Sequence, residues 1–362
     1  AKGNKMDKNY LELIKKLETK KSLSTTEYEA IISYYQNANA KLQKEIRDYV
    51  SKKAVDAVKK VYGNAIFIRG LMEISNYCKN DCLYCGIRRS NKEVERYRLK
   101  KDDILSACEV GYDLGFRTFV LQGGEDPYYT DDILCDIIKS IKEKYKDVAI
   151  TLSLGEKSKE SFKKLRDAGA DRYLLRHETA DDNHYSLLHP ESMLLSSRME
   201  SLNALKELGY QAGCGFMVGS PYQTATTIAK DLKFIEEFKP AMCGIGPFIP
   251  HHNTPFKNMP KGDTGLTCYL LSLIRLIIPN ILLPATTALA TLSGNGRIEG
   301  ILSGANVIMP NLSPLSNRKN YEIYDNKAYQ NDEAAESIEL IKEQMKNIGY
   351  EIVIDRGDVK KI

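Results

Sequence analysis

The chain has 362 residues, about twice the commonest domain size, which allows one large domain or two ordinary ones. Hydrophobic residues make up 43% and charged residues 28%, and this composition excludes a disordered, collagenous or coiled-coil chain. The 52 Lys and Arg against 48 Asp and Glu leave a formal charge of +4, which is too small to indicate a nucleic-acid partner.

Residues 1–62 are predicted to form a helical lead-in. Apolar residues recur at helical spacing from Leu11 onward, and Ser24 with Glu27 has the spacing of a capping box. Lysines are frequent here, but the acidic residues among them indicate a solvated helix surface rather than a nucleic-acid face. Residues 1–5 precede the first Met and are interpreted as a remnant of an expression vector.

Residues 63–311 alternate short β-branched or apolar runs with amphipathic helical patterns. Eight strands are expected, at residues 66–75, 118–123, 149–154, 172–177, 211–218, 242–248, 282–288 and 306–310. Helices are expected between them, at residues 102–114, 131–145, 159–168, 192–208, 224–238, 266–278 and 297–302. Eight such units predict an α/β fold, a (β/α)8 TIM-type barrel whose working end is the ring of loops after the strands. A doubly wound sheet is the alternative, but its first turn should be glycine-rich, whereas this one carries cysteines.

Residues 312–362 are expected to form a C-terminal extension packed on the barrel, with a helix at 332–346 and a strand at 350–354. The longest apolar stretch, residues 269–292, is broken by Arg275 and by prolines, so no membrane span is predicted. We find no signal-peptide pattern, and eight cysteines are too few for a disulfide scaffold, which together predict a cytoplasmic location.

Three cysteines stand close together directly after the first predicted strand. Cys78, Cys82 and Cys85 are spaced C-x3-C-x2-C within the run N-Y-C-K-N-D-C-L-Y-C-G-I-R-R. A structural zinc site would need a fourth ligand, but the other cysteines are dispersed and all five histidines lie at or beyond His177. A 4Fe–4S cluster on three thiolates would keep one iron open to the amino and carboxylate groups of S-adenosylmethionine (SAM). The pattern favours this cluster over zinc.

The cysteine loop resembles the signature of the radical SAM superfamily, and the resemblance extends to the end of the predicted barrel. It implies that a reduced cluster cleaves SAM to methionine and a 5′-deoxyadenosyl radical, so no side chain is expected as a catalytic acid or base. Tyr84 matches the family's aromatic position near the adenine. By the same resemblance, the other SAM contacts would be Gly123, Gly124, Ser153, Glu178, Arg198 and Met217.

Charged residues alternate along the fourth predicted strand. Arg172, Arg176 and Glu178 fall on one face, which we take to be the barrel interior, and Thr151 and Ser153 share one face of the third strand. Burying two arginines and a carboxylate is costly unless they pair with one another or meet a charged ligand. A structural ion-pair network and a ligand site both remain open.

Within the superfamily, several long runs resemble the FeFe-hydrogenase maturases of the HydE type. Among them are T-L-S-L-G-E from Thr151, D-R-Y-L-L-R-H-E-T-A from Asp171 and G-I-G-P-F-I-P-H from Gly244. The resemblance implies action on a cysteine-bearing iron–CO–cyanide synthon during assembly of the hydrogenase active site. It implies a substrate cavity lined by Gln122, Thr151, Arg176, Thr286, Thr287 and Met309, with Arg69, Arg172 and Tyr324 deeper.

The chain departs from the HydE pattern at two points. Some family members carry a second cluster on C-terminal cysteines, but no cysteine follows Cys268, so a single cluster is predicted. Gly123 stands where the family can have a serine, which removes one hydroxyl from the cavity. The five cysteines outside the loop are interpreted as ordinary buried thiols.

The partners implied by the resemblance are a small organometallic or amino-acid-derived substrate, a low-potential electron donor and the other hydrogenase maturases. A methylornithine-synthase-like mutase acting on an amino acid is one alternative function. A non-enzymatic iron–sulfur or zinc scaffold is another. A biotin-synthase-like sulfur insertase would need an auxiliary cluster, for which the sequence offers no ligand set.

Overall fold

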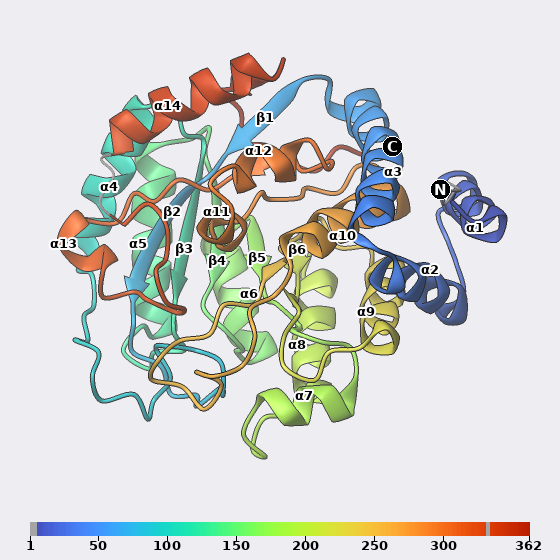
Figure 1. Ribbon diagram of the computed structural model, residues 1–362. Coiled ribbons are helices and arrows are strands. Elements are labelled where there is room, and N and C mark those ends of the chain that lie inside the picture. Colours follow the sequence, from blue (N-terminus) through green and yellow to red (C-terminus); the bar gives the residue numbers. More distant parts are fainter. Residues whose placement is uncertain (1–5, 331–333) are drawn as a thin grey trace.

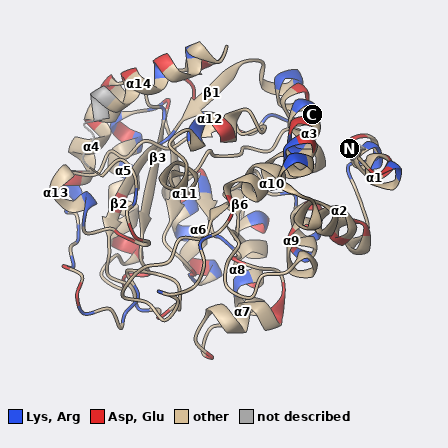
Figure 2. Ribbon diagram, viewed as in Figure 1, with Lys and Arg blue, Asp and Glu red and all other residues tan. Residues whose placement is uncertain are grey.

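The computed structural model describes residues 6–330 and 334–362, so the presumed vector remnant lies outside the described residues. The first three helices are α1 (Lys8–Lys20), α2 (Thr25–Asn37) and α3 (Ala40–Tyr62) (Figure 1). Ser24 and Glu27 form the expected capping box at the start of α2. Figure 2 shows basic and acidic residues interspersed over the outer helices, as the sequence indicated. None of the described helices has the length and apolar character that crossing a membrane requires.

Parallel strands close into a (β/α)8 barrel, which confirms the predicted fold class. The main sheet runs in the order β2–β3–β4–β5–β6–β8, and β10 returns to pair with β1. Between β8 and β10 the wall is completed by Leu282 and Pro284, which make isolated bridges to Met242 and Val307. The strands are β1 (Ala65–Ile68), β2 (Gly70–Ser75), β3 (Thr118–Gly123), β4 (Ala149–Ser153), β5 (Arg172–Leu174), β6 (Gln211–Cys214), β8 (Met242–Cys243) and β10 (Val307–Ile308).

Two of the predicted strands are broken by glycines. β7 (Met217–Val218) and β9 (Gly246–Pro247) follow β6 and β8 and form a separate parallel pair. The breaks fall at Gly215 and Gly244, where a Cβ on Gly215 would stand 2.0 Å from the Gly244 carbonyl oxygen. Only glycine lets the two backbones approach so closely, so these residues end the regular ladder.

Helices cover the outside of the barrel in the order expected from the sequence. They are α4 (Lys101–Asp113), α5 (Asp131–Lys144), α6 (Lys159–Ala168), α8 (Leu195–Glu207), α9 (Ala225–Phe238), α10 (Thr264–Ile277) and α12 (Gly296–Ile301). Three short helices were not predicted: α7 (Asp182–Leu188), α11 (Thr287–Leu292) and α13 (Leu315–Arg318). The strand expected at 282–288 is wrong at its end, because the Thr286 side chain caps α11.

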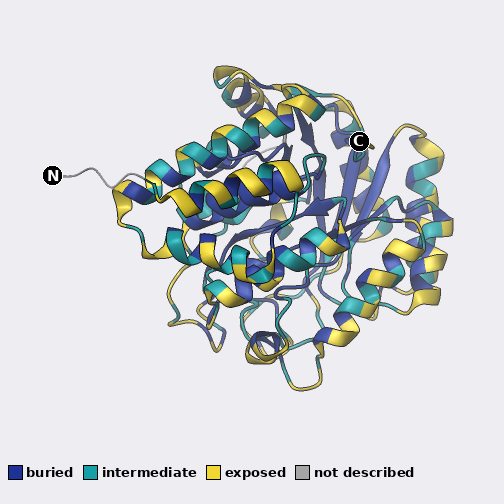
Figure 3. Ribbon diagram, turned by 90° about the vertical axis from the view of Figure 1, so that its right-hand side faces the viewer, coloured by how far each residue is buried: buried dark blue, intermediate teal, exposed yellow. Residues whose placement is uncertain are grey.

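The longest apolar stretch forms a core helix. Every residue of α10 from Leu266 to Ile277 is buried, because α3 packs along its outer side while the barrel lies beneath it. Arg275, within this helix, donates hydrogen bonds to the carbonyl oxygens of Gly304 and Pro279, both at 2.9 Å. Most of the other helices keep an exposed outer face, while the barrel strands are largely buried (Figure 3).

The chain after the barrel returns to β1. α14 (Ala334–Asn347) corresponds to the helix expected at 332–346, of which residues 332 and 333 lie outside the described residues. β11 (Glu351–Val353) pairs with β1 on the edge opposite β10. The next segment, residues 355–359, is called the C-terminal tail below. It contacts residues at the amino ends of β3, β5 and β6.

Candidate active site

The three cysteines lie in the loop between β2 and α4, at the carboxyl end of the barrel. The Lys79 amide donates to the Glu125 carbonyl oxygen at 2.9 Å, which ties the loop to the end of β3. The Gly86 amide donates to the Ile323 carbonyl oxygen at 2.9 Å, which ties it to the C-terminal extension. Free, partly buried thiols are present at Cys78, Cys82 and Cys85.

The three sulfur atoms of the loop do not all lie within 4.8 Å of one another, the separation expected for the ligands of a single ion. Among the described residues, three ligand atoms lie within 4.8 Å of one another only at His251, His252 and Asp325. Burial raises the pKa of all three thiols, that of Cys85 to about 12, so their thiolates need a compensating cation. Three thiolates set wider apart than the ligands of a single ion fit an iron–sulfur cluster.

Tyr84 is fixed by a histidine that the sequence did not single out. Its hydroxyl lies 3.1 Å from His189 Nε2, and the two rings meet edge-on. Burial lowers the pKa of His189 to about 4, so the ring is neutral at pH 7. Its Nδ1 donates to the Tyr185 carbonyl oxygen at 2.9 Å, so Nε2 accepts from the Tyr84 hydroxyl. The contact with His189 therefore fixes the position of the Tyr84 ring beside the cysteines.

A cavity of about 290 Å³ opens next to the cysteine loop. Predicted site residues that border it are Tyr84, Cys85, Gln122, Gly123, Ser153, Arg176, Glu178, Arg198, Met217, Thr286 and Tyr324. The structure adds Phe248, Ile249 and Tyr321, which come from irregular segments. Phe248 and Ile249 belong to the run G-I-G-P-F-I-P-H from Gly244 that carries the family resemblance, whereas Tyr321 follows no periodic pattern that could have revealed it.

Arg176 and Glu178 bring unpaired polar atoms to this cavity. Arg176 Nε lies 3.3 Å from Glu178 Oε1 but does not form a hydrogen bond with it. Among the described residues, Arg176 Nη2 and Glu178 Oε2 are buried and have no hydrogen-bond partner. The two side chains form an ion pair, but their buried atoms without hydrogen bonds are costly, so the pair suits a ligand that offers both a donor and an acceptor.

Arg198 reaches the cavity from α8. It is buried, and its Nε donates to Glu156 Oε1 at 2.5 Å while Nη1 donates to the Arg176 carbonyl oxygen at 2.5 Å. These contacts fix the guanidinium and neutralise part of its charge. Glu156 follows β4 in an irregular segment; it ends the run T-L-S-L-G-E that carries the family resemblance, but it was assigned no role from the sequence.

The two glycines after β3 have different surroundings. Gly123 borders the cavity, but Gly124 does not. A Cβ on Gly124 would stand 2.1 Å from the Tyr77 carbonyl oxygen and 2.8 Å from Cys78 Cβ. Gly124 therefore allows the end of β3 to contact the cysteine loop and does not face the main cavity.

Thr287 and Met309 border a smaller neighbouring cavity of about 30 Å³. Thr286 borders both this cavity and the main one. Of the predicted substrate contacts, Thr287 and Met309 therefore border only the smaller cavity.

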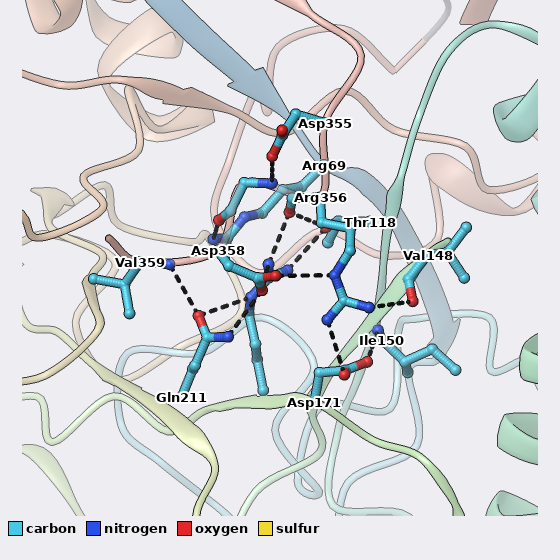
Figure 4. A network of polar contacts seen from close by, with 12 residues as sticks. Arg69, Thr118, Val148, Ile150, Asp171, Gln211, Asp355, Arg356, Asp358 and Val359 are labelled. Carbon is cyan, nitrogen blue, oxygen red and sulfur yellow. Dashed lines mark hydrogen bonds and ion pairs between the residues drawn. The ribbon is translucent and has the colours of Figure 1, made fainter. Parts of the chain in front are cut away.

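Arg69, Thr151 and Arg172 lie toward the opposite end of the barrel, where they border a cavity of about 10 Å³. Arg172 forms an ion pair with Asp358 of the C-terminal tail at 2.6 Å and donates to the Arg356 carbonyl oxygen at 2.7 Å. Figure 4 shows these tail residues in a polar network with Asp171 and Gln211, at the amino ends of β5 and β6. The structure therefore separates these three residues from the cavity beside the cysteines, and Arg172 belongs to a structural network.

The family of the chain follows from its relatives. Residues 72–235, from β2 through the cysteine loop to α9, match the family model of the radical SAM superfamily. The fold and the site thus define a radical SAM enzyme, a class that uses a 4Fe–4S cluster and SAM. The FeFe hydrogenase maturase subunit HydE of Thermotoga maritima is 42% identical over 311 residues, 86% of this chain and 88% of that protein. The chain belongs to this HydE family of radical SAM enzymes.

Other relatives share the fold with lower identity. The 3-methylornithine synthase of Methanosarcina acetivorans is 29% identical over 72% of this chain and 74% of its own length. A crystal structure of methylornithine synthase aligns with a TM-score of 0.80 at 23% identity, over 94% of this chain and 97% of that one. A crystal structure of the maturase HydG aligns with a TM-score of 0.76 at 23% identity, over 96% and 76% of the chains. At such identity the two structures show the barrel fold alone.

Proposed function

We propose that this enzyme holds a single 4Fe–4S cluster on Cys78, Cys82 and Cys85 and cleaves SAM reductively during assembly of the FeFe-hydrogenase active site. Its substrate would be a cysteine-bearing iron–CO–cyanide synthon. Bound together, the cluster and SAM would supply a 5′-deoxyadenosyl radical. The observation that supports this most is that the cysteine loop borders one cavity with the Arg176–Glu178 ion pair, whose Nη2 and Oε2 atoms lack hydrogen-bond partners.

The residues around the cavity would bind SAM by complementary charge. Glu178 would accept hydrogen bonds from its ammonium group, and Arg198 would bind its carboxylate. Ser153 offers a hydroxyl at the end of β4, while Tyr84 and Met217 offer apolar surface to the adenosine. The protein's part is to bind, orient and exclude water, and no side chain is assigned as an acid or base.

The substrate would lie on the side of the cavity away from the cysteines. Gln122, Arg176, Thr286 and Tyr324 would contact it, and a carboxylate derived from cysteine would suit Arg176 Nη2, which has no hydrogen-bond partner among the described residues. Thr287 and Met309 would act only through the smaller cavity behind Thr286. Arg69, Thr151 and Arg172 are left out of this set because they lie toward the barrel floor.

The number of clusters and the partners are part of the proposal. No cysteine follows Cys268, so the C-terminal extension offers no thiolate for a second cluster. A low-potential electron donor would reduce the cluster, and the other hydrogenase maturases would supply and receive the intermediates.

Anaerobic reconstitution followed by incubation with SAM and dithionite tests the proposal. We expect one cluster per chain and release of 5′-deoxyadenosine, both lost in Cys82→Ala. A Cys82→Ala variant with a normal cluster and normal SAM cleavage would overturn the ligand assignment. Absence of 5′-deoxyadenosine from the cluster-loaded wild type would indicate an inert scaffold instead.

Complementation tests the role in hydrogenase maturation. In a host that lacks its own HydE gene, this protein should restore hydrogenase activity, and Cys82→Ala should not. A mutase of the methylornithine synthase type is the second candidate, because that relative matches 72% of the chain. Turnover of lysine without restored hydrogenase activity would identify the mutase.

A further inference from the structure

Glu178 has a strained backbone at the point where it borders the cavity. Its φ of 64° lies in the left-handed region, which side chains other than those of Gly, Asn and Asp rarely adopt. Such a conformation persists only where the surrounding structure holds it. The Glu178 amide donates to the Gly215 carbonyl oxygen at 3.0 Å, but this bond fixes only one side of the residue.

The preceding residue, His177, is anchored behind the barrel wall. It is fully buried and packs against Phe234, with ring centroids 4.7 Å apart. Its Nδ1 accepts a hydrogen bond from the Gly215 amide at 3.3 Å, so the neutral ring carries its proton on Nε2. That Nε2 donates to Asp231 Oδ1 at 3.1 Å.

Asp231 holds the chain on both sides of Glu178. It lies on α9 and is fully buried, and the oxygen that accepts from His177 also accepts from the Ala180 amide at 2.6 Å. One carboxylate oxygen therefore fixes the residue before Glu178 and the residue two positions after it. Neither Asp231 nor His177 borders the cavity, so neither can contact a ligand there.

We infer that Asp231 and His177 are positioning residues that hold Glu178 in its left-handed conformation and so direct its carboxylate toward the amino group of SAM. The inference rests on the proposed role of Glu178 in SAM binding. It makes α9, on the outside of the barrel, a determinant of SAM affinity. Asp231 and His177 together are called the clamp below.

Three variants in α9 separate positioning from general stability. Asp231→Ala removes the clamp, and we expect it to weaken SAM binding to the cluster-loaded protein by about tenfold or more. Asp231→Asn keeps an oxygen for both hydrogen bonds, and we expect an affinity within about threefold of the wild type. Leu232→Ala is the matched control, because it opens a cavity beside the clamp but leaves it intact. It should lower the melting temperature without changing SAM affinity.

The outcome of this comparison decides the inference. Wild-type affinity in Asp231→Ala would overturn it, and so would an Asp231→Asn variant as weak as Asp231→Ala, because charge rather than geometry would then matter. His177→Leu provides a second route if Asp231→Ala does not fold. It should weaken SAM binding in the same way, and wild-type affinity in it would overturn the inference.

Hydrogen exchange of the metal-free protein tests the clamp without SAM. The Ala180 amide should exchange slowly in the wild type, in Asp231→Asn and in His177→Leu, which all keep the accepting oxygen, but much faster in Asp231→Ala. Fast exchange in the wild type would overturn the clamp. If the wild type instead shows slow exchange but binds no SAM, the proposed function fails while the clamp itself stands.

Discussion

At the scale of single residues, the charged pair in the cavity can be divided between two ligands. We expect Glu178→Gln to weaken SAM binding about tenfold, because a neutral amide no longer attracts an ammonium group. Arg176→Gln should retain SAM binding and uncoupled cleavage but lose the substrate-dependent product. Equilibrium binding of labelled SAM and chromatography of 5′-deoxyadenosine measure these effects. If Arg176→Gln abolishes SAM binding as well, Arg176 belongs to the SAM site.

Gly124 provides a separate test of the cysteine loop. In Gly124→Ala the new methyl group would overlap the Tyr77 carbonyl oxygen, 2.1 Å away, and press on Cys78. We expect the loop to shift and the iron content after reconstitution to fall to about half or less, since an overlap with backbone must move it. Gly294→Ala is the matched control, because nothing lies within 4 Å of a Cβ there. Equal iron in the two variants would show that the loop tolerates the displacement.

Functional residues could be predicted from the sequence where a short local pattern marks them. Residues that act through contacts with distant parts of the chain could not be predicted. The cysteine spacing and the alternation around Arg176 and Glu178 could be read from a few neighbouring letters. Asp231 could not, because its partner His177 lies on another element and an aspartate on a helix is ordinarily a surface residue. His189 was hidden in the same way, since its function depends on a contact with Tyr84.

At the scale of elements, the long helices and most strand starts were predicted well, but the ends of the strands after β4 and three short helices were not. Amphipathic periodicity fixes a helix such as α6 at Lys159–Ala168, as expected. The residue at which a strand ends depends on contacts with backbone segments from elsewhere in the fold. The backbone of Gly215 packs closely against that of Gly244, and this contact ends the regular pairing of the strands. No pattern within either segment of the sequence indicates the contact. Thr287 was expected in a strand for its β propensity, but the cap at Thr286 outweighs it.

Among the described residues, no carboxylate forms an ion pair with Arg275 in the core helix α10. Burial lowers the pKa of Arg275 to about 9, and its guanidinium is held by the carbonyl oxygens of Gly304, Pro279 and Ile281 and by Asn306. We expect Arg275→Leu to leave these acceptors unsatisfied and to lower the free energy of unfolding by about 3 kcal/mol.

Denaturant unfolding of the metal-free protein, followed by circular dichroism, measures the effect of Arg275→Leu. Arg275→Lys is the control, because one ammonium can satisfy part of the same set of acceptors. It should fall between the wild type and Arg275→Leu. A loss below about 1 kcal/mol in Arg275→Leu would mean that water replaces the guanidinium.

At the scale of the whole molecule, the C-terminal tail and the barrel floor depend on each other. Burial alone would raise the pKa of Asp358, but Arg172 and hydrogen bonds from Arg356 and Gln211 outweigh it and lower the pKa to about 2. Because the folded pKa lies below the unfolded value of about 3.9, Asp358 stabilises the fold above about pH 4. That contribution is lost as the pH falls toward 2.

We expect Asp358→Asn to lower the free energy of unfolding at pH 7 by about 1–2 kcal/mol, a modest value because Asp358 is partly exposed. The difference from the wild type should shrink as the pH is lowered below about 4. Urea titrations at pH 7 and pH 3.5 measure it. A difference that stays constant with pH would show that the lost ion pair is not its cause.

Arg172 also shows why the floor could not be predicted. Its place on one face with Arg176 and Glu178 correctly indicated a charged interior, and the sequence left an ion-pair network and a ligand site open. The partner, Asp358, lies in a segment with no regular pattern and far along the chain. Only the fold brings the two together.

The pairing of β1 with β10 and β11 affects how this chain folds. Phe67 in β1 lies opposite Val307 of β10 on one side and Val353 of β11 on the other. Both partners are separated from Phe67 by most of the sequence, so β1 has no strand neighbour nearby in the chain on either of these edges. Pairings of such long range slow folding, because much of the chain must be ordered before they form. Until then both edges of β1 are open to other chains, so we expect refolding yield to fall as the protein concentration rises.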